Sequence, residues 1–221
     1  MPDTGGTRVT HVLLDADGVL QDVPAREWGT WAQAFVGDDV EEFFARVDLL
    51  ERVAYAGRTD FLAGLARVLD DLGATADAEE VHVAVWRRTL PVAGSLEVVD
   101  ALRRNGYGVH LGSNQEPVRA AWMRESFGYD ALLDSSHYSC DVGAAKPERA
   151  FFDEVVRRLG VEPGSVLLVD DTAENVEGAR AAGLAAVLWT VADGHDTLLA
   201  LLDEHGVDAR SVTPAGTSAQ R

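Results

Sequence analysis

The apolar residues of the chain follow two different periodicities. Residues 8–14, RVTHVLL, form a short and almost continuously apolar run, which is typical of a strand buried on both faces of a parallel sheet. From Pro24 to about Trp86, apolar residues recur at helical spacing and no strand is evident. The residues that carry this spacing are Trp28, Trp31, Phe35, Phe43, Phe44, Val47, Phe61, Leu65, Val68 and Leu69.

After Pro91 the chain alternates between these two periodicities. Such alternation predicts a parallel sheet covered by helices on both faces. We therefore expect an α/β fold: residues 1–20 and 91–221 form a Rossmann-like, doubly wound parallel sheet, and residues 21–90 are inserted as an all-helical domain. In the second part, the expected strands are 107–111, 165–169 and 184–189, and the expected helices are 95–104, 116–127, 147–159 and 173–182.

Composition supports a folded domain and excludes some kinds of binding partner. The chain has 221 residues, 47% hydrophobic and 25% charged, which is enough to bury a core. Its net charge of −18 repels phosphate backbones and anionic lipids, so we expect neither nucleic acid nor a membrane as partner. Cys140 is the single cysteine and no long apolar run is present, so we expect a cytoplasmic protein without an internal disulfide.

Two carboxylates follow the first predicted strand directly. Asp15 and Asp17 flank Ala16, and Gly18 comes next, where glycine lets the backbone turn sharply and approach a ligand. The functional crevice of an open α/β sheet lies at the carboxyl ends of its strands. This position therefore favours a nucleophile paired with a proton donor, whereas the residues alone also fit an ordinary turn.

A second acidic pair, Asp170 and Asp171, follows the predicted strand 165–169. It faces the same sheet edge as Asp15, and clustered carboxylates repel one another unless a cation lies between them. Oxygen ligands with room left for water and phosphate favour Mg²⁺ over zinc or calcium. The alternative is that Asp171 caps the following helix, a role that is compatible with metal binding.

Three further residues suit the binding of a phosphate group. Ser113 and Asn114 lie between the predicted strand 107–111 and a helix, where hydroxyl, amide and helix N–H groups form an anion site, although both residue types are also common helix caps. Lys146 precedes Pro147 and is the single lysine among 19 basic residues. Because an arginine fork does not replace a compact ammonium, this lysine indicates a required positive charge facing the crevice.

These segments together resemble the four motifs of the haloacid dehalogenase-like hydrolases. The resemblance covers roughly residues 9–189 and is closest to the subclass in which a helical cap is inserted between the first two motifs. It implies that residues 21–90 are that cap. The four segments, in the order in which they occur, are HVLLDADGVL, VHLGSNQ, AAKPERAFF and VLLVDDTAENVEGARAAG.

The resemblance implies Mg²⁺-dependent hydrolysis of a small phosphomonoester, with a role for each residue. Asp15 would be the nucleophile that forms an aspartyl phosphate, and Asp17 would protonate the leaving alcohol and then activate water. Ser113, with Asn114 beside it, would bind the phosphoryl oxygens, and Lys146 would hold both nucleophile and phosphate. The implied Mg²⁺ ligands are Asp15, the backbone carbonyl of Asp17, Asp170 and Asp171, with Asp171 the preferred direct ligand of the acidic pair.

Other activities remain open on these residues. A phosphomutase would use the same two acids and differ in how the cap excludes water. A 2-haloacid dehalogenase resembling this subclass usually lacks the second aspartate, because halide leaves without a proton, so Asp17 favours phosphoryl transfer. A non-catalytic binding protein on the same fold is a further alternative. A signalling receiver domain is disfavoured, because its acidic pair would come first and it has no helical insert.

The cap would determine the choice of substrate, because the core contacts only phosphate and the leaving oxygen. Residues 55–59, YAGRT, form an expected loop before an expected helix at 60–72. Arg58 in this loop is the candidate for contact with a polar leaving group. The expected partner is a small phosphorylated substrate, and we expect a monomer or a homodimer.

Overall fold

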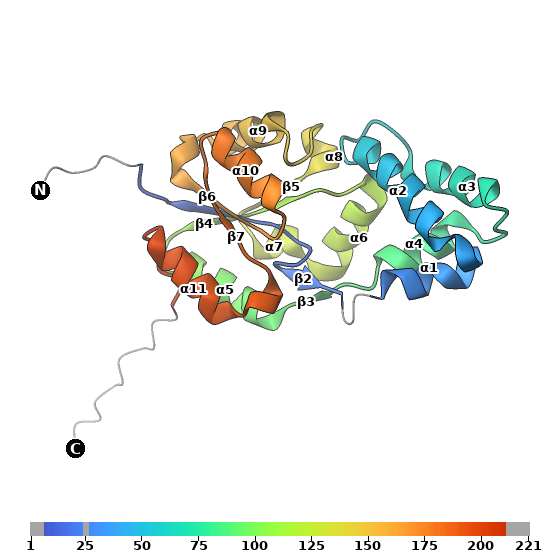
Figure 1. Cartoon of the computed structure of the whole chain (residues 1–221). Helices are drawn as coiled ribbons and strands as arrows, with labels where there is room; N and C mark the ends of the chain where they lie inside the picture. Colours follow the sequence, from blue (N-terminus) through green and yellow to red (C-terminus); the bar gives the residue numbers. More distant parts are fainter. Residues whose placement is uncertain (1–6, 24–26, 211–221) are drawn as a thin grey trace, which may run out of the picture.

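A five-stranded parallel sheet forms the centre of the computed structural model, which describes residues 7–23 and 27–210 (Figure 1). Its strands are β1 His11–Leu14, β4 Gly108–Ser113, β5 Ser135–Tyr138, β6 Val166–Asp170 and β7 Ala185–Leu188. The strand order is β5-β4-β1-β6-β7, and every neighbouring pair is parallel. Strand β1 therefore lies between the two halves of the sheet, at the point where the strand order reverses.

Helices cover both faces of this sheet. One face carries an apolar core to which α5, α6, α7 and α11 contribute, and the other face carries a core formed with α9 and α10. The helices are α5 Ala93–Arg104, α6 Pro117–Phe127, α7 Tyr129–Leu132, α8 Ser139–Val142, α9 Arg149–Leu159, α10 Ala173–Ala181 and α11 His195–Glu204.

The central strand is apolar because it is buried on both sides. Val12 and Leu14 belong to one apolar core and Leu13 to the other, as expected when successive side chains point to opposite faces. All three are at most 2% exposed. Strand β1 therefore fixes the position of Asp15, the residue that follows it.

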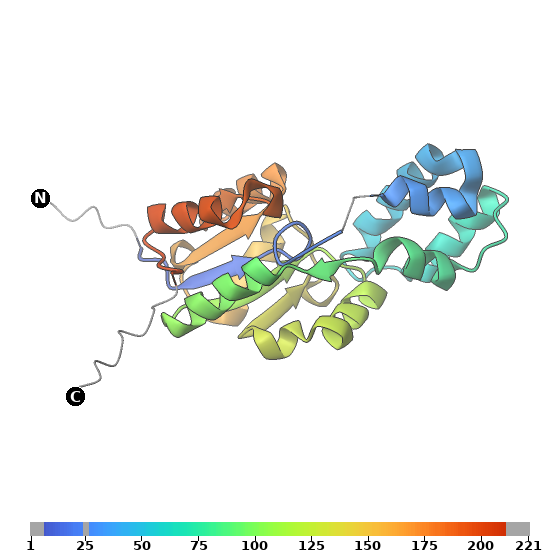
Figure 2. The same cartoon turned by 90° about the horizontal axis from the view of Figure 1, so that it is seen from below.

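Four helices form an insert between β1 and α5, which we call the helical insert, residues 28–86 (Figure 2). They are α1 Trp28–Val36, α2 Val40–Ala54, α3 Phe61–Asp71 and α4 Ala78–Trp86. The insert has its own apolar core, in which Phe43, Phe61 and Leu65 are fully buried. Two chain segments connect the insert to the core, and they pair with each other as the short antiparallel strands β2 Gln21–Asp22 and β3 Leu90–Pro91.

The structure confirms the predicted α/β fold, with differences at the ends of elements and in segments where no element was expected, among them β2 and β3. Expected strand 107–111 continues to Ser113 as β4. Strand β5 was not expected because its sequence, SSHY, is polar and lies at the sheet edge, where alternation is weak. Helices α7, α8 and α11 were not expected either.

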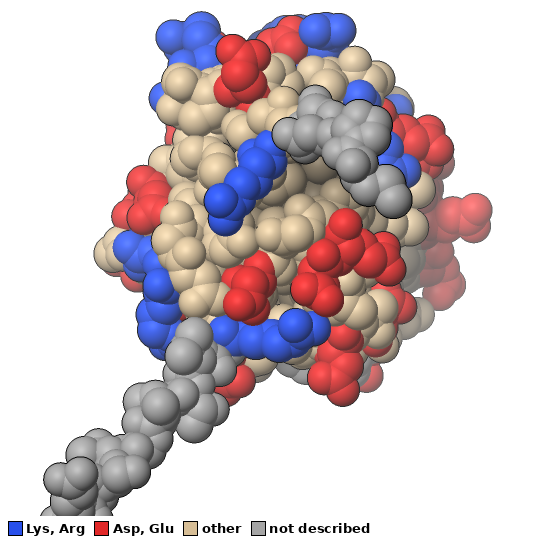
Figure 3. All heavy atoms as spheres, turned by 90° about the vertical axis from the view of Figure 1, so that its left-hand side faces the viewer, with Lys and Arg blue, Asp and Glu red and all other residues tan. Residues whose placement is uncertain are grey.

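The surface charge is mixed at the end of the core that faces away from the insert. Figure 3 shows acidic and basic side chains interspersed with uncharged surface there, with no continuous basic patch on that face. Among the described residues, no helix combines the length and the apolar character that crossing a membrane requires.

A hydrogen-bonded chain of histidines crosses β1, β4 and β5. His11 Nδ1 lies 3.0 Å from His110 Nε2, and Ser135 Oγ lies 2.8 Å from His110 Nδ1 and 2.9 Å from His137 Nε2. Burial lowers the pKa of both His110 and His137 to about 4, and neighbouring positive charge adds to the effect. Both side chains are therefore neutral in the folded protein near neutral pH.

We predict that these histidines make the free energy of unfolding fall as the pH is lowered from about 7 to about 5. The unfolded chain binds protons below its ordinary histidine pKa of about 6.5, whereas folded His110 and His137 bind them only near 4. Urea unfolding at both pH values should show that His137→Asn reduces this loss by roughly 2 kcal/mol.

The control is His205→Asn, at the exposed C-terminal end of α11. It should leave the loss between the two pH values at the wild-type level. A His137→Asn variant with the wild-type pH dependence would show that this buried histidine is not held neutral by the fold.

Candidate active site

Three adjacent strands bring the polar motif residues to one edge of the sheet. Asp15 follows β1, Ser113 ends β4 and Asp170 ends β6. Because these strands are neighbours and parallel, their carboxyl ends lie at the same crevice. Lys146 reaches this crevice from the segment before α9, although it is far from the others in sequence.

The ammonium group of Lys146 lies between two buried carboxylates. Its Nζ is 2.9 Å from Asp15 Oδ1 and 2.5 Å from Asp170 Oδ2. Burial alone would lower the pKa of Lys146, but the charges and hydrogen bonds of the two carboxylates raise it instead. The lysine is therefore a permanent positive charge at the centre of the site.

Asp15 is nevertheless not fully neutralised by this lysine. Burial raises the pKa of Asp15 to about 7, against the effect of Lys146, and the charges of Asp170 and Asp17 add to the rise. The site thus holds more negative than positive charge. A further cation would stabilise the ionised form of Asp15.

The two members of the acidic pair have different surroundings. Asp170 is fully buried, and both of its oxygens accept hydrogen bonds, Oδ2 from Lys146 and Oδ1 from the Thr172 amide and Asn175. Asp171 is partly exposed, and its Oδ1 accepts from the Thr172 hydroxyl at 3.1 Å. Asp170 therefore orients Lys146, whereas Asp171 has the freer carboxylate.

The carboxylates fit a divalent cation by their chemistry. Asp15, Asp170 and Asp171 each offer an oxygen, and these oxygens lie within 4.8 Å of one another. Burial, followed by the charge of Asp170, raises the pKa of Asp171, which again indicates too little positive charge. An oxygen-only donor set of this kind suits Mg²⁺. The Asp17 side chain is not in this group, so only its backbone could take part.

Glycine is required at position 18 for this arrangement. Gly18 has a φ of 74°, in the left-handed region, and a side chain there would overlap the Asp171 carboxylate. The turn after Asp17 can therefore approach Asp171 closely only because the residue has no Cβ.

The side chain of Asp17 is held by four donor groups. Arg119 Nη1 and Nη2 donate to its two oxygens at 2.6 and 2.7 Å, Gln115 donates to Oδ2 at 2.9 Å and Gln21 to Oδ1 at 2.8 Å. Burial would raise the pKa of Asp17, but the charge and hydrogen bonds of Arg119, with those of the two glutamines, lower it overall. We call Arg119, Gln115 and Gln21 the Asp17 clamp.

Arg119 also connects the core with the helical insert. Its Nε donates to the backbone oxygen of Trp86, at the end of α4, at 2.9 Å. A second contact lies nearby, where His82 of α4 is 2.9 Å from the Glu116 carboxylate at the start of α6. The insert therefore docks on α6 through the same arginine that holds Asp17.

Ser113 and Asn114 lie at the sheet edge but contact different groups. Ser113 is buried, and its Oγ accepts from Gln115 at 3.1 Å. The Asn114 side chain exchanges two hydrogen bonds of 2.8 Å with the backbone of Lys146, so it positions the lysine. The first N–H groups of α6 donate to the Glu116 carboxylate, so this helix start is not the free anion site that the sequence suggested.

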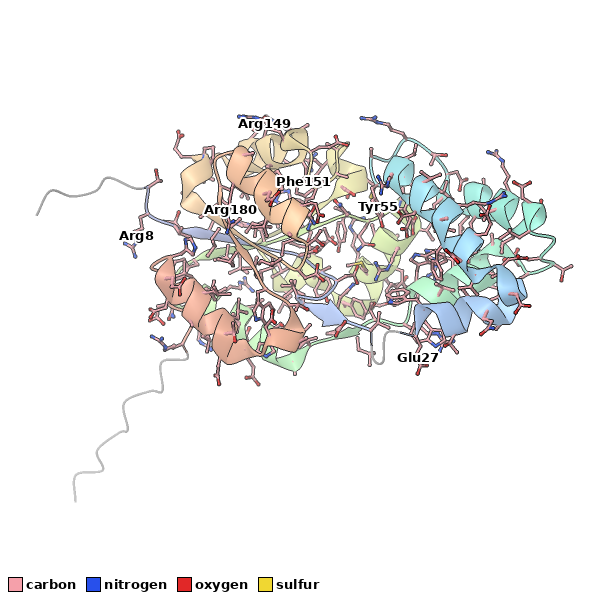
Figure 4. All side chains as sticks on the ribbon, in the orientation of Figure 1. Arg8, Glu27, Tyr55, Arg149, Phe151 and Arg180 are labelled. Atoms are coloured by element: carbon pink, nitrogen blue, oxygen red, sulfur yellow. The ribbon has the colours of Figure 1, made fainter. Side chains whose placement is uncertain are left out.

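The expected specificity residue, Arg58, lies away from the cavities beside Asp17. It is exposed and does not line either of them. Another residue of the same expected loop does face the core: Tyr55, the residue after α2, lies where the insert meets the core (Figure 4). The structure thus places Tyr55, rather than Arg58, beside the candidate site.

The partners of Asp17 were not expected from the sequence. Gln115 lies just before α6 and Arg119 in its first turn, and Arg119 Nη1 donates to Gln115 Oε1 at 2.9 Å. In the sequence, Arg119 is marked only by its place in the helix that follows a motif strand, and this signal is weak. Gln21 follows the DADG turn and has no distinguishing pattern.

Comparison with known proteins identifies the family. A family model described as haloacid dehalogenase-like hydrolase matches residues 9–183, which include every candidate residue of the sheet edge. The chain belongs to this family and is a hydrolase. The fold and the charged sheet edge agree with that assignment.

Two curated relatives are similar in sequence. Phosphatase MT3486 of Mycobacterium tuberculosis is 31% identical over 200 residues, which cover 81% of this chain and 87% of the relative. Flavin mononucleotide hydrolase 1 of Arabidopsis thaliana is 30% identical over 100 residues, which cover 45% of this chain and 40% of the relative.

Solved structures share the fold at lower identity. A HAD family enzyme of Bacteroides thetaiotaomicron, solved as a magnesium complex, matches with a TM-score of 0.75 at 18% identity, over 87% of this chain and 98% of that one. L-2-haloacid dehalogenase of Xanthobacter autotrophicus matches with a TM-score of 0.61 at 21% identity, over 81% of this chain and 77% of that one.

We predict that Gly178→Ala lowers the free energy of unfolding by about 1–3 kcal/mol. A Cβ at Gly178 of α10 would overlap the backbone oxygen of Pro147, so α10 or the segment that carries Lys146 would have to move. Urea unfolding measures the effect.

Gly29→Ala in α1 is the matched control, because the nearest atom to its added Cβ is a Val40 methyl at 3.8 Å. The control should keep or slightly raise stability, since alanine favours a helix over glycine. Equal stability of the two variants would contradict the close packing of α10 on Pro147.

Proposed function

We propose that the protein is a phosphatase that hydrolyses a small phosphate monoester through an aspartyl phosphate on Asp15. The observation that carries the proposal is the 2.9 Å contact between buried Asp15 and the Lys146 ammonium, in the cluster of oxygen ligands that suits a divalent cation. The similarity to a protein named as a phosphatase, over most of both chains, supports the same reaction.

In the proposed first step, an oxygen of Asp15 attacks phosphorus, and the bond from phosphorus to the leaving oxygen breaks. A carboxylate and a phosphate dianion repel each other, so positive charge must lie beside both. Lys146 supplies part of that charge through its contacts with Asp15 and Asp170. Asp15 and Asp171 would hold Mg²⁺, which would supply further positive charge to the phosphoryl oxygens.

Asp17 is the proposed acid and base. It would donate a proton to the leaving alkoxide and then accept one from the water that attacks phosphorus, which releases phosphate and restores Asp15. Four donor groups now occupy both of its oxygens, so at least one must withdraw before it carries a proton. Because Arg119 also contacts Trp86, we propose that the insert is a cap whose movement loosens the Asp17 clamp.

Carbon–halogen cleavage is the weaker alternative. A halide leaves without a proton, so a second aspartate at position 17 with a dedicated clamp would serve no purpose there. The similarity to L-2-haloacid dehalogenase, at 21% identity, concerns the fold. Phosphate esters therefore fit the residues of this site better.

We predict that the protein releases inorganic phosphate from a panel of phosphate monoesters with Mg²⁺ and stops when a chelator is added. Asp15→Asn should lower kcat/KM by at least about 10³-fold, because an amide is a poor nucleophile. The control, Asp153→Asn on the exposed side of α9, should keep wild-type activity. Activity that persists in the chelator or in Asp15→Asn would contradict the mechanism.

The acidic pair should separate into two roles. Asp171→Asn should raise the Mg²⁺ concentration for half-maximal activity by at least about tenfold, because it removes a proposed ligand. Asp170→Asn should lower the free energy of unfolding by roughly 3 kcal/mol, because Lys146 loses a buried counter-charge. Magnesium titrations and urea unfolding of both variants provide the test, and the reverse pattern would assign the metal to Asp170.

A further inference from the structure

A cavity of about 290 Å³ lies between the helical insert and the core, next to Asp17. Asp17 and Arg119 line its core side. If the proposed function holds, an ester whose phosphorus is at Asp15 places its leaving group beside Asp17, which protonates it. This cavity, which we call the leaving-group cavity, is therefore where the alcohol part of the substrate lies.

The leaving-group cavity has room for a small alcohol. Pockets for drug-sized ligands have volumes of about 300–1,000 Å³, so about 290 Å³ is at the lower end. A group of a few carbon atoms fits this space, and a neighbouring hollow of about 530 Å³, which shares Asp48, Glu51 and Tyr55 with it, reaches Lys146.

Aromatic side chains form much of the wall on the side of the insert. Trp28 begins α1, Phe44 lies on α2, Tyr55 follows α2 and Trp86 ends α4. Aromatic faces attract cations as well as apolar groups, and several rings around one space are a recognised way to bind an alkylated ammonium. The rings alone leave a neutral apolar group as an alternative.

The charges in the same cavity favour the cation. The Glu51 carboxyl lines it and accepts hydrogen bonds from Trp86 Nε1, at 2.8 Å, and from the Tyr55 hydroxyl. Among residues 7–23 and 27–210, no basic side chain forms an ion pair with Glu51. Burial raises the pKa of Glu51 to about 7, although these hydrogen bonds and the charge of Arg119 oppose the rise.

The other charged groups that line the cavity do not offset the negative charge of Glu51. Arg119 is the basic residue of the cavity wall, but both of its Nη atoms donate to Asp17, so that pair is close to neutral. Asp48 also lines the cavity and forms an exposed 3.4 Å ion pair with Arg52, which is weak in solvent. The negative charge that remains in the leaving-group cavity is that of Glu51, which has no ion-pair partner among the described residues, together with that of Asp48, which is only weakly compensated.

We propose that the leaving-group cavity binds an ammonium group, so that the substrates are phosphate monoesters of small amino alcohols, including N-alkylated ones, and Glu51 determines this specificity. The ammonium pairs with the Glu51 carboxylate and contacts the rings of Trp28, Phe44 and Trp86. Hydrolysis adds water and gives phosphate and the free amino alcohol. Alcohols that carry a carboxylate or a second phosphate are repelled.

The first experiment compares choline phosphate with 3,3-dimethylbutyl phosphate, which has the same shape but no charge, in the presence of Mg²⁺. Because only the charge differs, kcat/KM should be at least about tenfold higher for choline phosphate. Glu51→Gln keeps the shape of the side chain and should bring the ratio of the two kcat/KM values close to one. Glu41→Gln, exposed on the same helix and outside the cavity, should keep the wild-type ratio.

The second experiment measures binding without catalysis, by titrating choline and 3,3-dimethylbutanol into the full-length protein and following tryptophan fluorescence. Trp28 and Trp86 line the cavity, so an occupant changes their emission. Choline should bind at least about tenfold more tightly than the neutral alcohol, and Glu51→Gln should remove this difference.

The two experiments distinguish the failure of this inference from the failure of the proposed function. If the protein hydrolyses phosphate esters but shows equal kcat/KM for the charged and neutral pair, or prefers a carboxylate-bearing ester such as phosphoglycolate, the cation site is wrong and the phosphatase stands. If it hydrolyses no ester, the proposed function is wrong, and the binding titration alone decides whether the cavity selects an ammonium.

Discussion

The contact of Lys146 with Asp15 and Asp170 is the interaction on which the site depends. Three carboxylates meet at the edge of the sheet, and without a buried ammonium their repulsion would make this edge unstable. Lys146 lowers the pKa of Asp15, but burial raises it to about 7, so Asp15 is only partly ionised near neutral pH. An edge that lacks positive charge in this way is suited to a divalent cation, which could in turn attract a phosphate group.

The core and the helical insert are linked through groups that also surround the reaction centre. Arg119 contacts Asp17 in the core and the Trp86 backbone in the insert, and Trp86 in turn donates to Glu51. Substrate that enters between the two parts must displace or rearrange these contacts. In the proposed mechanism, one set of neighbouring side chains therefore couples the position of the insert, the freedom of Asp17 and the choice of alcohol.

Much of the fold could be predicted from the sequence, because parallel strands buried on both faces must be apolar and end abruptly in polar residues. That rule is sufficient to place Asp15, Ser113 and Asp170 at one edge of the sheet. Residues of the clamp could not be predicted, since Gln21 and Arg119 come from segments whose approach depends on tertiary packing. Arg58 is exposed and lines neither cavity beside Asp17, because position in a loop does not define which side chain faces the core.

Covalent phosphorylation of Asp15 during turnover is the step that the proposed mechanism requires. Quenching the reaction in acid, reducing the acyl phosphate with borohydride and locating the reduced residue by peptide mass spectrometry would detect it. We expect the carboxyl group of residue 15 to be reduced to the alcohol only when Mg²⁺ and a phosphate ester are both present. Turnover with no modified residue, or with modification at Asp17 or another carboxylate instead, would contradict it.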